Sequence, residues 1–375
     1  MGKMTTTKRS PAADLIRIFA FFSVVSVHFF MKSGFYDGIV AGERMYIMTL
    51  MRSFFMICVP LFLVLSGFLL RKKQLEKSYY SRVWKIILTY LLASISCIVY
   101  CVVFKKQAFS LKDSILNILG FAAAPYSWYV EMYLGLFLLI PFLNIVYHAI
   151  PSQKGKLWLI ATFVILTALP SVFNVYYWNS AWWALPSASD SKNKLIASWW
   201  ETLYPITYYY IGCYLSEYGL KINKALNAGL IVVCIVVSGS YCYWRSYQAP
   251  FIQGAWCSYG SLFNLVLSVL VFVFFQNLSY EKLPEKLSLF LKKVSGLCLG
   301  AYLVSWIFDT AFYPTLLKKV PMMTDRLEYY FVMIPLVFVC SLLLSYILSK
   351  LQLLLELGFG KLSCLFRKKT QKQDA

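Results

Sequence analysis

Three ionisable side chains interrupt the first long apolar stretch of the sequence, and they are its first candidates for chemistry. Asp14, Arg17 and His28 fall within the segment DLIRIFAFFSVVSVHFF. A charged side chain at mid-membrane costs at least ~2.5–3.5 kcal/mol on insertion scales, so each needs a reason to be there. An imidazole is the side chain best suited to take a proton from a hydroxyl near neutral pH. We interpret His28 as a general base; the alternative is a histidine that is only hydrogen-bonded within a helix bundle.

The spacing of these residues places them along one helix. Asp14 and Arg17 are three apart and are expected to pair. Arg17 and His28 are eleven apart, which at ~100° per residue returns to within ~20° of the same face and separates their Cα atoms by ~16 Å. We therefore expect Arg17 near the cytoplasmic boundary of the membrane and His28 deeper in the bilayer.

Two further acids stand in apolar segments. Glu131 comes early in WYVEMYLGLFLLIPFLN, and we predict that it orients or activates a hydroxyl, or pairs with His28 or an arginine. The alternative is a carboxylate near water that only charges the end of its helix. Asp309, in YLVSWIFDT, has the same two interpretations. His148 lies at the end of an apolar segment, where we expect a structural role.

Basic residues follow the second apolar segment. Arg71 stands in an Arg-Lys-Lys cluster, and Arg82 and Lys85 follow at i,i+3 spacing. On one helix face, the last two are suited to clamp phosphate groups from the cytoplasm, and we predict that these three residues bind a ligand that carries phosphate groups. The alternative is the positive charge that all cytoplasmic loops of membrane proteins carry.

The elements that must position these residues are membrane-spanning helices. Of 375 residues, 60% are hydrophobic and only 14% are charged, against roughly 45–50% and 25% in soluble domains. At ~20 residues per span, this predicts an all-α, polytopic integral membrane protein of about ten helices. The expected spans are 12–31, 46–70, 83–104, 128–148, 157–175, 202–219, 227–244, 259–277, 296–316 and 328–350, of which those starting at 128 and 202 are the least secure.

The distribution of charge predicts the topology. The formal net charge is +20, but the basic residues flank apolar segments, which indicates contact with membrane lipids and excludes a nucleic-acid groove. They gather on the loops of one side, so we expect a plasma-membrane protein with both termini in the cytoplasm. We predict one transmembrane domain over residues 1–355 and a basic cytoplasmic tail over 356–375.

The cysteines give no sign of a metal site, and several tryptophans gather in one segment. The ten cysteines show no C-x-x-C pair and no spacing typical of a metal site. Segment 176–201, on the predicted outer side, is rich in tryptophan and is interpreted as an interfacial aromatic belt or as a cap that binds something amphipathic. The tryptophans in question are Trp178, Trp182, Trp183, Trp199 and Trp200.

Taken together, the motifs resemble a known family. The segment DLIRIFAFFSVVSVH is similar to the Asp-x-x-Arg and Arg-x10-His signature of the membrane acyltransferase-3 family. The segments VPLFLVLSGFLL, SRVWKI, WYVEMYLGLFLLIPFLN and VSGLCLGAYLVSW follow in the family's order, so the resemblance covers almost the entire chain.

The resemblance implies a ten-helix O-acyltransferase. Such a protein takes an acyl group, usually acetyl from acetyl-CoA, and places it on a hydroxyl of a surface polysaccharide or lipid-linked glycan precursor. By position, His28 is the catalytic histidine, which acts as a general base or accepts the acyl group itself. Arg17 is its partner, and Glu131 matches a family acidic position. The resemblance also places Arg82 and its neighbours at the cytoplasmic donor side.

The sequence departs from the family pattern at two places. Lys85 stands where many members have a second arginine, which loses one bidentate fork. Ser305 stands where many have a second histidine, so no role can be assigned to that histidine here. Some members carry a fused soluble domain; without one, the acyl group is expected to go directly to a lipid-linked glycan or to a separate protein.

A rival interpretation is a proton-coupled glycan or lipid transporter. In it, Asp14, Arg17, His28 and Glu131 form a proton relay or a substrate path. A transporter moves its substrate unmodified, whereas an acyltransferase needs a donor and changes the mass of its acceptor. A receptor or scaffold without chemistry leaves Arg17 and His28 unexplained.

Overall fold

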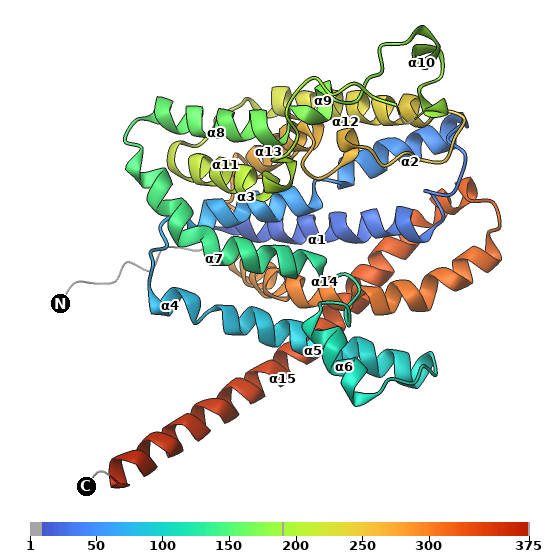
Figure 1. The fold of residues 1–375 in the computed structure, drawn as a ribbon. Coiled ribbons are helices and arrows are strands. Elements are labelled where there is room, and N and C mark those ends of the chain that lie inside the picture. Colours follow the sequence, from blue (N-terminus) through green and yellow to red (C-terminus); the bar gives the residue numbers. More distant parts are fainter. Residues whose placement is uncertain (1–9, 190, 374–375) are drawn as a thin grey trace.

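The chain folds almost entirely into α-helices in a computed structural model that describes residues 10–189 and 191–373, with side chains through Leu357 (Figure 1). Strands are absent from these residues, and only two isolated bridges join residues 39–40 to 247–250. The helices are α1 (Pro11–Lys32), α2 (Gly42–Phe55), α3 (Cys58–Leu70), α4 (Lys77–Tyr80), α5 (Val83–Phe104), α6 (Leu111–Leu119), α7 (Trp128–Ala149), α8 (Gln153–Thr167), α9 (Pro170–Phe173), α10 (Ser180–Ala184), α11 (Tyr204–Tyr218), α12 (Lys224–Ser246), α13 (Leu262–Gln276), α14 (Glu285–Lys319) and α15 (Tyr330–Gln373). Four short 3-10 turns are η1 (Pro186–Ala188), η2 (Glu201–Leu203), η3 (Ala255–Cys257) and η4 (Thr324–Tyr329).

The predicted all-α polytopic membrane fold is confirmed. Within the described residues, nine helical segments are long and apolar enough to cross a membrane. The one expected span that is not among these nine, 202–219, corresponds to α11, which has only 15 residues. At ~1.5 Å per residue it is shorter than the hydrocarbon core. Most of α11 is buried within the bundle, so its apolar and tyrosine side chains contact protein rather than lipid.

Proline divides one expected span and interrupts another. The span predicted over 46–70 is two helices, α2 and α3, with a break at Met56 and Ile57. The cause is Pro60, whose ring would clash with the carbonyl group four residues earlier in a continuous helix. In the same way, α8 ends before Pro170, which begins the short α9.

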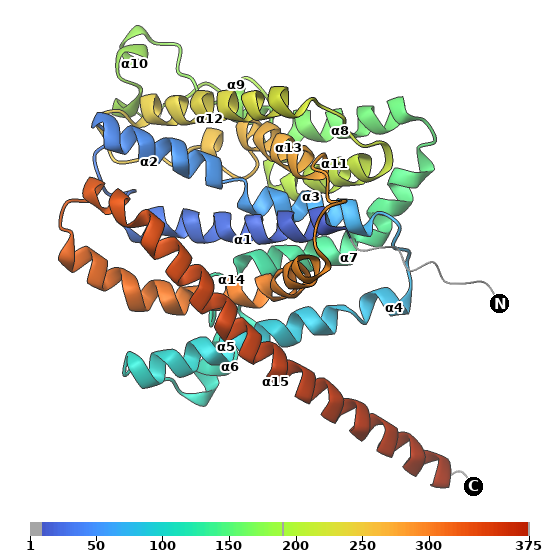
Figure 2. The ribbon, with the colours of Figure 1, turned by 180° about the vertical axis from the view of Figure 1, so that it is seen from behind.

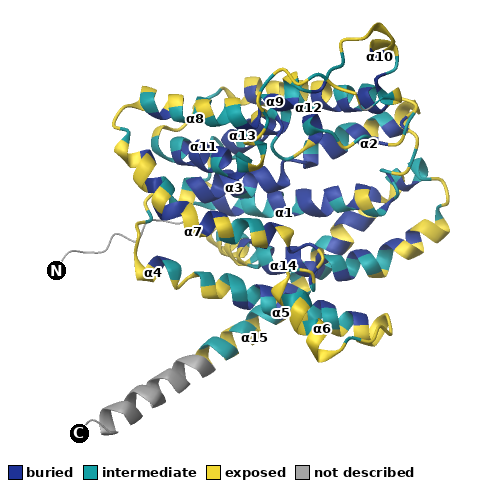
Figure 3. Ribbon diagram, in the orientation of Figure 1, coloured by how far each residue is buried: buried dark blue, intermediate teal, exposed yellow. Residues whose placement is uncertain are grey.

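Helix α1 lies at the centre of the bundle (Figures 1 and 2). It contacts α2, α3, α13, α14 and α15, and most of its residues are buried (Figure 3). Next to it, α3 and α11 cross at Gly67 and Gly212. A Cβ atom on Gly67 would lie 1.9 Å from the Tyr209 carbonyl oxygen, and one on Gly212 would lie 2.0 Å from that of Val64. Only glycine permits this approach, a common way for membrane helices to pack.

The two ends of the bundle carry different elements. Helix α1 begins, and α15 ends, on the side where α4 lies, whereas α6 and α10 lie at the opposite side (Figures 1 and 2). Of the predicted aromatic belt, Trp182 is instead buried, with the guanidinium of Arg245 4.6 Å from its ring, while the other four tryptophans are exposed. The basic tail predicted over 356–375 begins within α15, and its side chains from residue 358 onward lie outside the described residues.

Candidate active site

The C-terminal half of α1 places His28 against a buried acid of α14. His28 Nδ1 lies 3.4 Å from Asp309 Oδ2, and the Asp309 side chain is fully buried. The same face of α14 also carries Ser295 and Tyr302, because residues seven apart return to within ~20° of each other on a helix. Ser295 accepts a hydrogen bond from Arg17 Nη1 at 2.8 Å. One face of α14 therefore contacts both ends of the Arg17–His28 stripe on α1.

Tyr126, in the segment between α6 and α7, completes this group. Its ring lies 3.8 Å from the His28 ring, and its hydroxyl donates a 2.7 Å hydrogen bond to Asp309 Oδ2. Its own carbonyl oxygen accepts a hydrogen bond from the Tyr302 hydroxyl. Tyr126 is thus held by α14 at two points and covers one face of the imidazole.

The imidazole has one nitrogen turned toward Asp309 and one open. His28 Nδ1 is sealed from solvent and makes no hydrogen bond of good geometry, and neither does Asp309 Oδ1. A small rotation of the ring would close the 3.4 Å approach into a hydrogen bond. His28 Nε2 has no partner among the described residues either, but it is not sealed as Nδ1 is. An imidazole oriented by a carboxylate at one nitrogen and accessible at the other is the arrangement of a general base.

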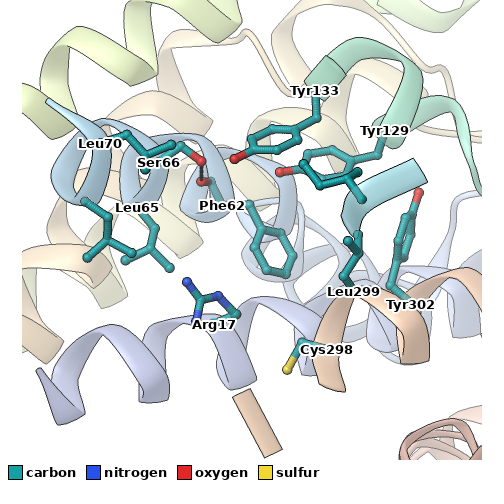
Figure 4. Close-up of a pocket in the computed structure, with 12 residues that line it drawn as sticks. Arg17, Phe62, Leu65, Ser66, Leu70, Tyr129, Tyr133, Cys298, Leu299 and Tyr302 are labelled. Carbon is teal, nitrogen blue, oxygen red and sulfur yellow. Dashed lines mark hydrogen bonds between the residues drawn. The ribbon is translucent and has the colours of Figure 1, made fainter. Parts of the chain in front are cut away.

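A cavity of about 250 Å³ lies between α1, α3, α5, α7 and α14. Figure 4 shows the Arg17 guanidinium reaching into it from α1, with Tyr129 and Tyr133 on the opposite wall. We call it the Arg17 cavity; its other lining residues are mostly apolar, among them Phe62, Leu65, Leu70 and Leu299. Arg17 also lies 3.8 Å from Asp14 Oδ1, at the predicted spacing. The cavity offers a cation and phenolic hydroxyl groups in an otherwise apolar space.

Two tyrosines separate this cavity from the histidine. Tyr302 lines the cavity and contacts Tyr126, which covers His28; His28 itself is not part of the cavity wall. Ser305, at the position of the missing family histidine, is buried and donates a hydrogen bond to the Tyr302 carbonyl oxygen. The contacts from Arg17 to His28 therefore pass through Tyr302 and Tyr126.

The predicted donor-binding residues occupy two places at the end of the bundle where α3 ends. Arg71 lines an open pocket of about 630 Å³ together with Lys72, Lys73 and His148. Its side chain hydrogen-bonds Ser216 at 2.9 Å and lies 3.8 Å from Glu217. His148 has a ring nitrogen 2.8 Å from the Arg71 carbonyl oxygen, which fits the structural role expected for it.

Arg82 and Lys85 lie at the start of α5, and both side chains are exposed. Ile86, four residues after Arg82, lines the Arg17 cavity. Because residues four apart share a helix face, Arg82 lies one turn from the cavity wall. Arg82 and Lys85 thus lie near the Arg17 cavity, whereas Arg71 lines a separate pocket.

Glu131 lies apart from the histidine. Its side chain is exposed, and it makes no hydrogen bond or ion pair with any residue in the described part of the chain. Tyr129 and Tyr133 point into the Arg17 cavity, and a residue two positions from each lies ~160° around the helix. The structure therefore does not bring Glu131 to His28, and its catalytic role stays a prediction.

Comparison with known proteins decides the family. The model of the acyltransferase domain family, acyltransferase-3, matches residues 10–350, nearly the whole chain. The chain belongs to the acyltransferase-3 family. Searches of curated proteins and of solved structures gave no match. The protein is therefore a membrane acyltransferase with an all-α, multi-pass fold.

Sequence reasoning missed the pairing within this acyltransferase. Asp309 stood out as an acid in an apolar segment, but nothing in one sequence assigned it to His28. Tyr126 gave no signal at all, because it lies in a loop among other tyrosines. The seven-residue spacing of Ser295, Tyr302 and Asp309 was present, but it acquires meaning only when α14 is known to pack on α1.

Proposed function

We propose that the protein is an O-acyltransferase that moves an acetyl group from acetyl-CoA to a hydroxyl of a surface polysaccharide or lipid-linked glycan. The observation that supports this most is His28, with Nδ1 turned to the buried Asp309 and Nε2 open. Acyl transfer to a hydroxyl needs a base of this kind, and the family supplies the reaction class.

The donor would enter beside the basic residues at the start of α5. Arg82 and Lys85 are exposed cations without an acidic partner among the described residues, as suits binding of the donor's phosphate groups. The acyl thioester would then occupy the Arg17 cavity, whose apolar walls exclude water. Transfer to the His28 side requires Tyr302 and Tyr126 to part, because they lie between the two.

The proposed acyl transfer moves one acyl group and one proton and needs no change of oxidation state. His28 Nε2 takes the proton of the acceptor hydroxyl while the hydroxyl oxygen attacks the thioester carbonyl carbon. The carbon–sulfur bond breaks, and the leaving CoA thiolate receives the proton. Asp309 stabilises the positive charge that forms on the imidazole. In a two-step route, Nε2 itself attacks the thioester carbonyl carbon and CoA leaves as the thiolate. The acceptor hydroxyl then takes the acyl group from Nε2, and its proton goes through the freed imidazole to the thiolate.

The test uses membranes that contain the native protein or His28→Ala at matched expression. Label from acetyl-CoA should appear in the extracted glycolipid or polysaccharide with the native protein and be lost with the variant. Exchange of labelled CoA into acetyl-CoA without acceptor would select the two-step route. Unmodified glycan crossing the membrane without any donor would instead support a transporter.

A further inference from the structure

A further pocket lies at the C-terminal end of α1, one helical turn beyond His28. It has a volume of about 520 Å³, within the range of small-molecule sites, and its wall includes Lys32, Asp37 and Arg326. We call it the Lys32 pocket. It lies at the end of α1 opposite to Arg17, so a molecule in it approaches His28 from the side away from the proposed donor.

Tyr126 connects this pocket to the reactive nitrogen. The Lys32 ammonium lies 5.9 Å from the centre of the Tyr126 ring, and the His28 ring lies 3.8 Å from the same ring. Lys32 and His28 are four apart on α1 and so share a helix face. The two residues are therefore about one helical turn apart along α1, ~6 Å, on the side of the Lys32 pocket.

The turn after α1 is built to keep Arg326 at this pocket. Arg326 is buried and donates hydrogen bonds to the carbonyl oxygens of Ser33, Val320 and Pro321 at 2.6–2.8 Å. Gly34 has φ +79°, and a Cβ there would also lie 3.1 Å from Arg326 Nη1. Glycine at this position therefore serves both the turn and the close approach of the guanidinium.

The positive charge of the pocket is not neutralised. Within the described residues, neither Lys32 nor Arg326 has a carboxylate within 4 Å. The acids nearest to Arg326 in sequence, Asp325 and Glu328, are paired with Arg44 at 2.5 and 3.0 Å. Among the described residues that line the wall, Asp37 is the one acid, beside the two cations Lys32 and Arg326. Such a site favours an anionic ligand, while Asp37 can accept hydrogen bonds from hydroxyl groups.

We propose that the Lys32 pocket binds an anionic group of the acceptor glycan, a carboxylate or a phosphate, and so holds a neighbouring hydroxyl at His28 Nε2. This inference rests on the proposed function and adds to it the charge of the acceptor. The same chemistry would also suit a lipid phosphate, which the experiment must distinguish.

The test measures binding, so it does not depend on turnover. The purified protein in nanodiscs of neutral phosphatidylcholine is titrated, by saturation-transfer NMR, with methyl glucopyranosiduronate and with the neutral methyl glucopyranoside. The native protein should bind the anionic glycoside at least tenfold more tightly. Lys32→Gln should reduce the difference to less than twofold, because it removes the positive charge that binds the anion. The variant should still fold, because Lys32 makes no hydrogen bond that holds the fold. Lys112→Gln, an exposed lysine on α6, should leave it unchanged.

Three results would overturn the proposal. The first is equal binding of the two glycosides by the native protein, and the second is a preference that survives Lys32→Gln. The third is loss of the preference in nanodiscs with anionic phosphatidylglycerol, which would assign the pocket to a lipid headgroup. If the binding preference is found but no acyl transfer occurs in the membrane assay, the proposed function fails and the anion site stands.

Discussion

Two clusters around acids, one half-buried and one fully buried, lie at opposite ends of the bundle and show how differently this protein uses charge. At the end where α3 and α11 finish, Glu217 accepts hydrogen bonds from Lys156 at 2.9 and 3.0 Å and lies 3.8 Å from Arg71. At the other, Asp309 Oδ2 accepts one hydrogen bond from Tyr126, and Oδ1 accepts none in the described structure.

We interpret the cluster around Glu217 as structural and the cluster around Asp309 and His28 as the one that serves the reaction. Around Glu217, the acid and both basic side chains have partners, so the cluster stabilises the packing of α3, α8 and α11. Around His28, two buried polar atoms lack hydrogen bonds, and leaving such atoms unpaired costs ~1–3 kcal/mol each. Such unpaired groups need an explanation, and at His28 a substrate or a moving proton would satisfy them.

The largest expected effect comes from the imidazole. His28→Gln should lower kcat by ~10²–10⁴-fold, the usual contribution of a general base, with no change in thermal stability, because the ring nitrogens hold no hydrogen bond in the resting structure. His148→Gln should leave kcat within about threefold, because the hydrogen bond of His148 in the described structure is to the backbone carbonyl oxygen of Arg71, far from the Asp309 cluster. Equal loss in both variants would contradict the assignment; the measurement is acyl transfer at saturating acetyl-CoA, with a melting curve for each variant.

The next effect contrasts the two acids directly. Asp309→Asn should lower kcat on the order of 10²-fold by leaving the imidazole without its counter-charge. Glu217→Gln should instead destabilise the fold by ~1–3 kcal/mol, because it leaves the Lys156 ammonium, only 5% exposed, with a weaker partner. Its kcat at saturating donor should stay within about threefold. The opposite pattern, with Glu217 needed for turnover and Asp309 for stability, would reverse the comparison.

Tyr126 should matter less than Asp309. Tyr126→Phe keeps the ring on His28 but removes the hydroxyl that donates to Asp309. Loss of one hydrogen bond to a charged group is worth ~1.5–3 kcal/mol, so kcat should fall by at least about tenfold. Tyr46→Phe, which removes a hydroxyl bonded to Ser240, serves as the matched control and should have no effect on kcat. An unchanged kcat in Tyr126→Phe would show that Asp309 holds its position without this contact.

The basic residues of α5 should affect donor binding alone. Replacing Arg82 or Lys85 by glutamine should raise the KM for acetyl-CoA about fivefold each, because an exposed ion pair contributes up to ~1 kcal/mol. The effect should shrink at high salt, and kcat should not change. Lys286→Gln, an exposed lysine at the start of α14, is the control. If Lys286→Gln raised KM as much as the two α5 variants do, the effect would come from general surface charge and not from a donor site.

The smallest expected effect is at Glu131. Its exposed side chain lies on the face of α7 away from the Arg17 cavity. Glu131→Gln should therefore change kcat by less than about threefold, measured in the same transfer assay. A loss as large as that of Asp309→Asn would restore Glu131 to the catalytic residues that the sequence predicts.

The sequence predicted the membrane-spanning helices well because burial in lipid demands long apolar segments. It also gave the Arg17–His28 stripe, because both residues lie in one helix with fixed geometry. The break at Pro60 was readable in principle, but hydropathy alone merged α2 and α3. Local information was therefore sufficient wherever a feature lies within a single helix.

What the sequence could not predict depends on how helices pack. Asp309 and Tyr126 are 281 and 98 positions from His28, and only the approach of α14 and the loop before α7 to α1 brings them together. One of the roles predicted for Glu131, pairing with His28, followed from their chemistry, yet the rotation of α7 turns Glu131 away. The rotation of a membrane helix is set by its neighbours, which no single segment encodes.

The most direct test of the central claim is a double-mutant cycle between His28 and Asp309. If Asp309 acts through the imidazole, the His28→Gln, Asp309→Asn double variant should have the same kcat as His28→Gln alone, because the second change removes a partner that no longer has a function. All four proteins would be compared at matched expression and saturating acetyl-CoA. If the two losses multiply, Asp309 acts independently of His28, and the pairing seen in the structure does not serve the reaction.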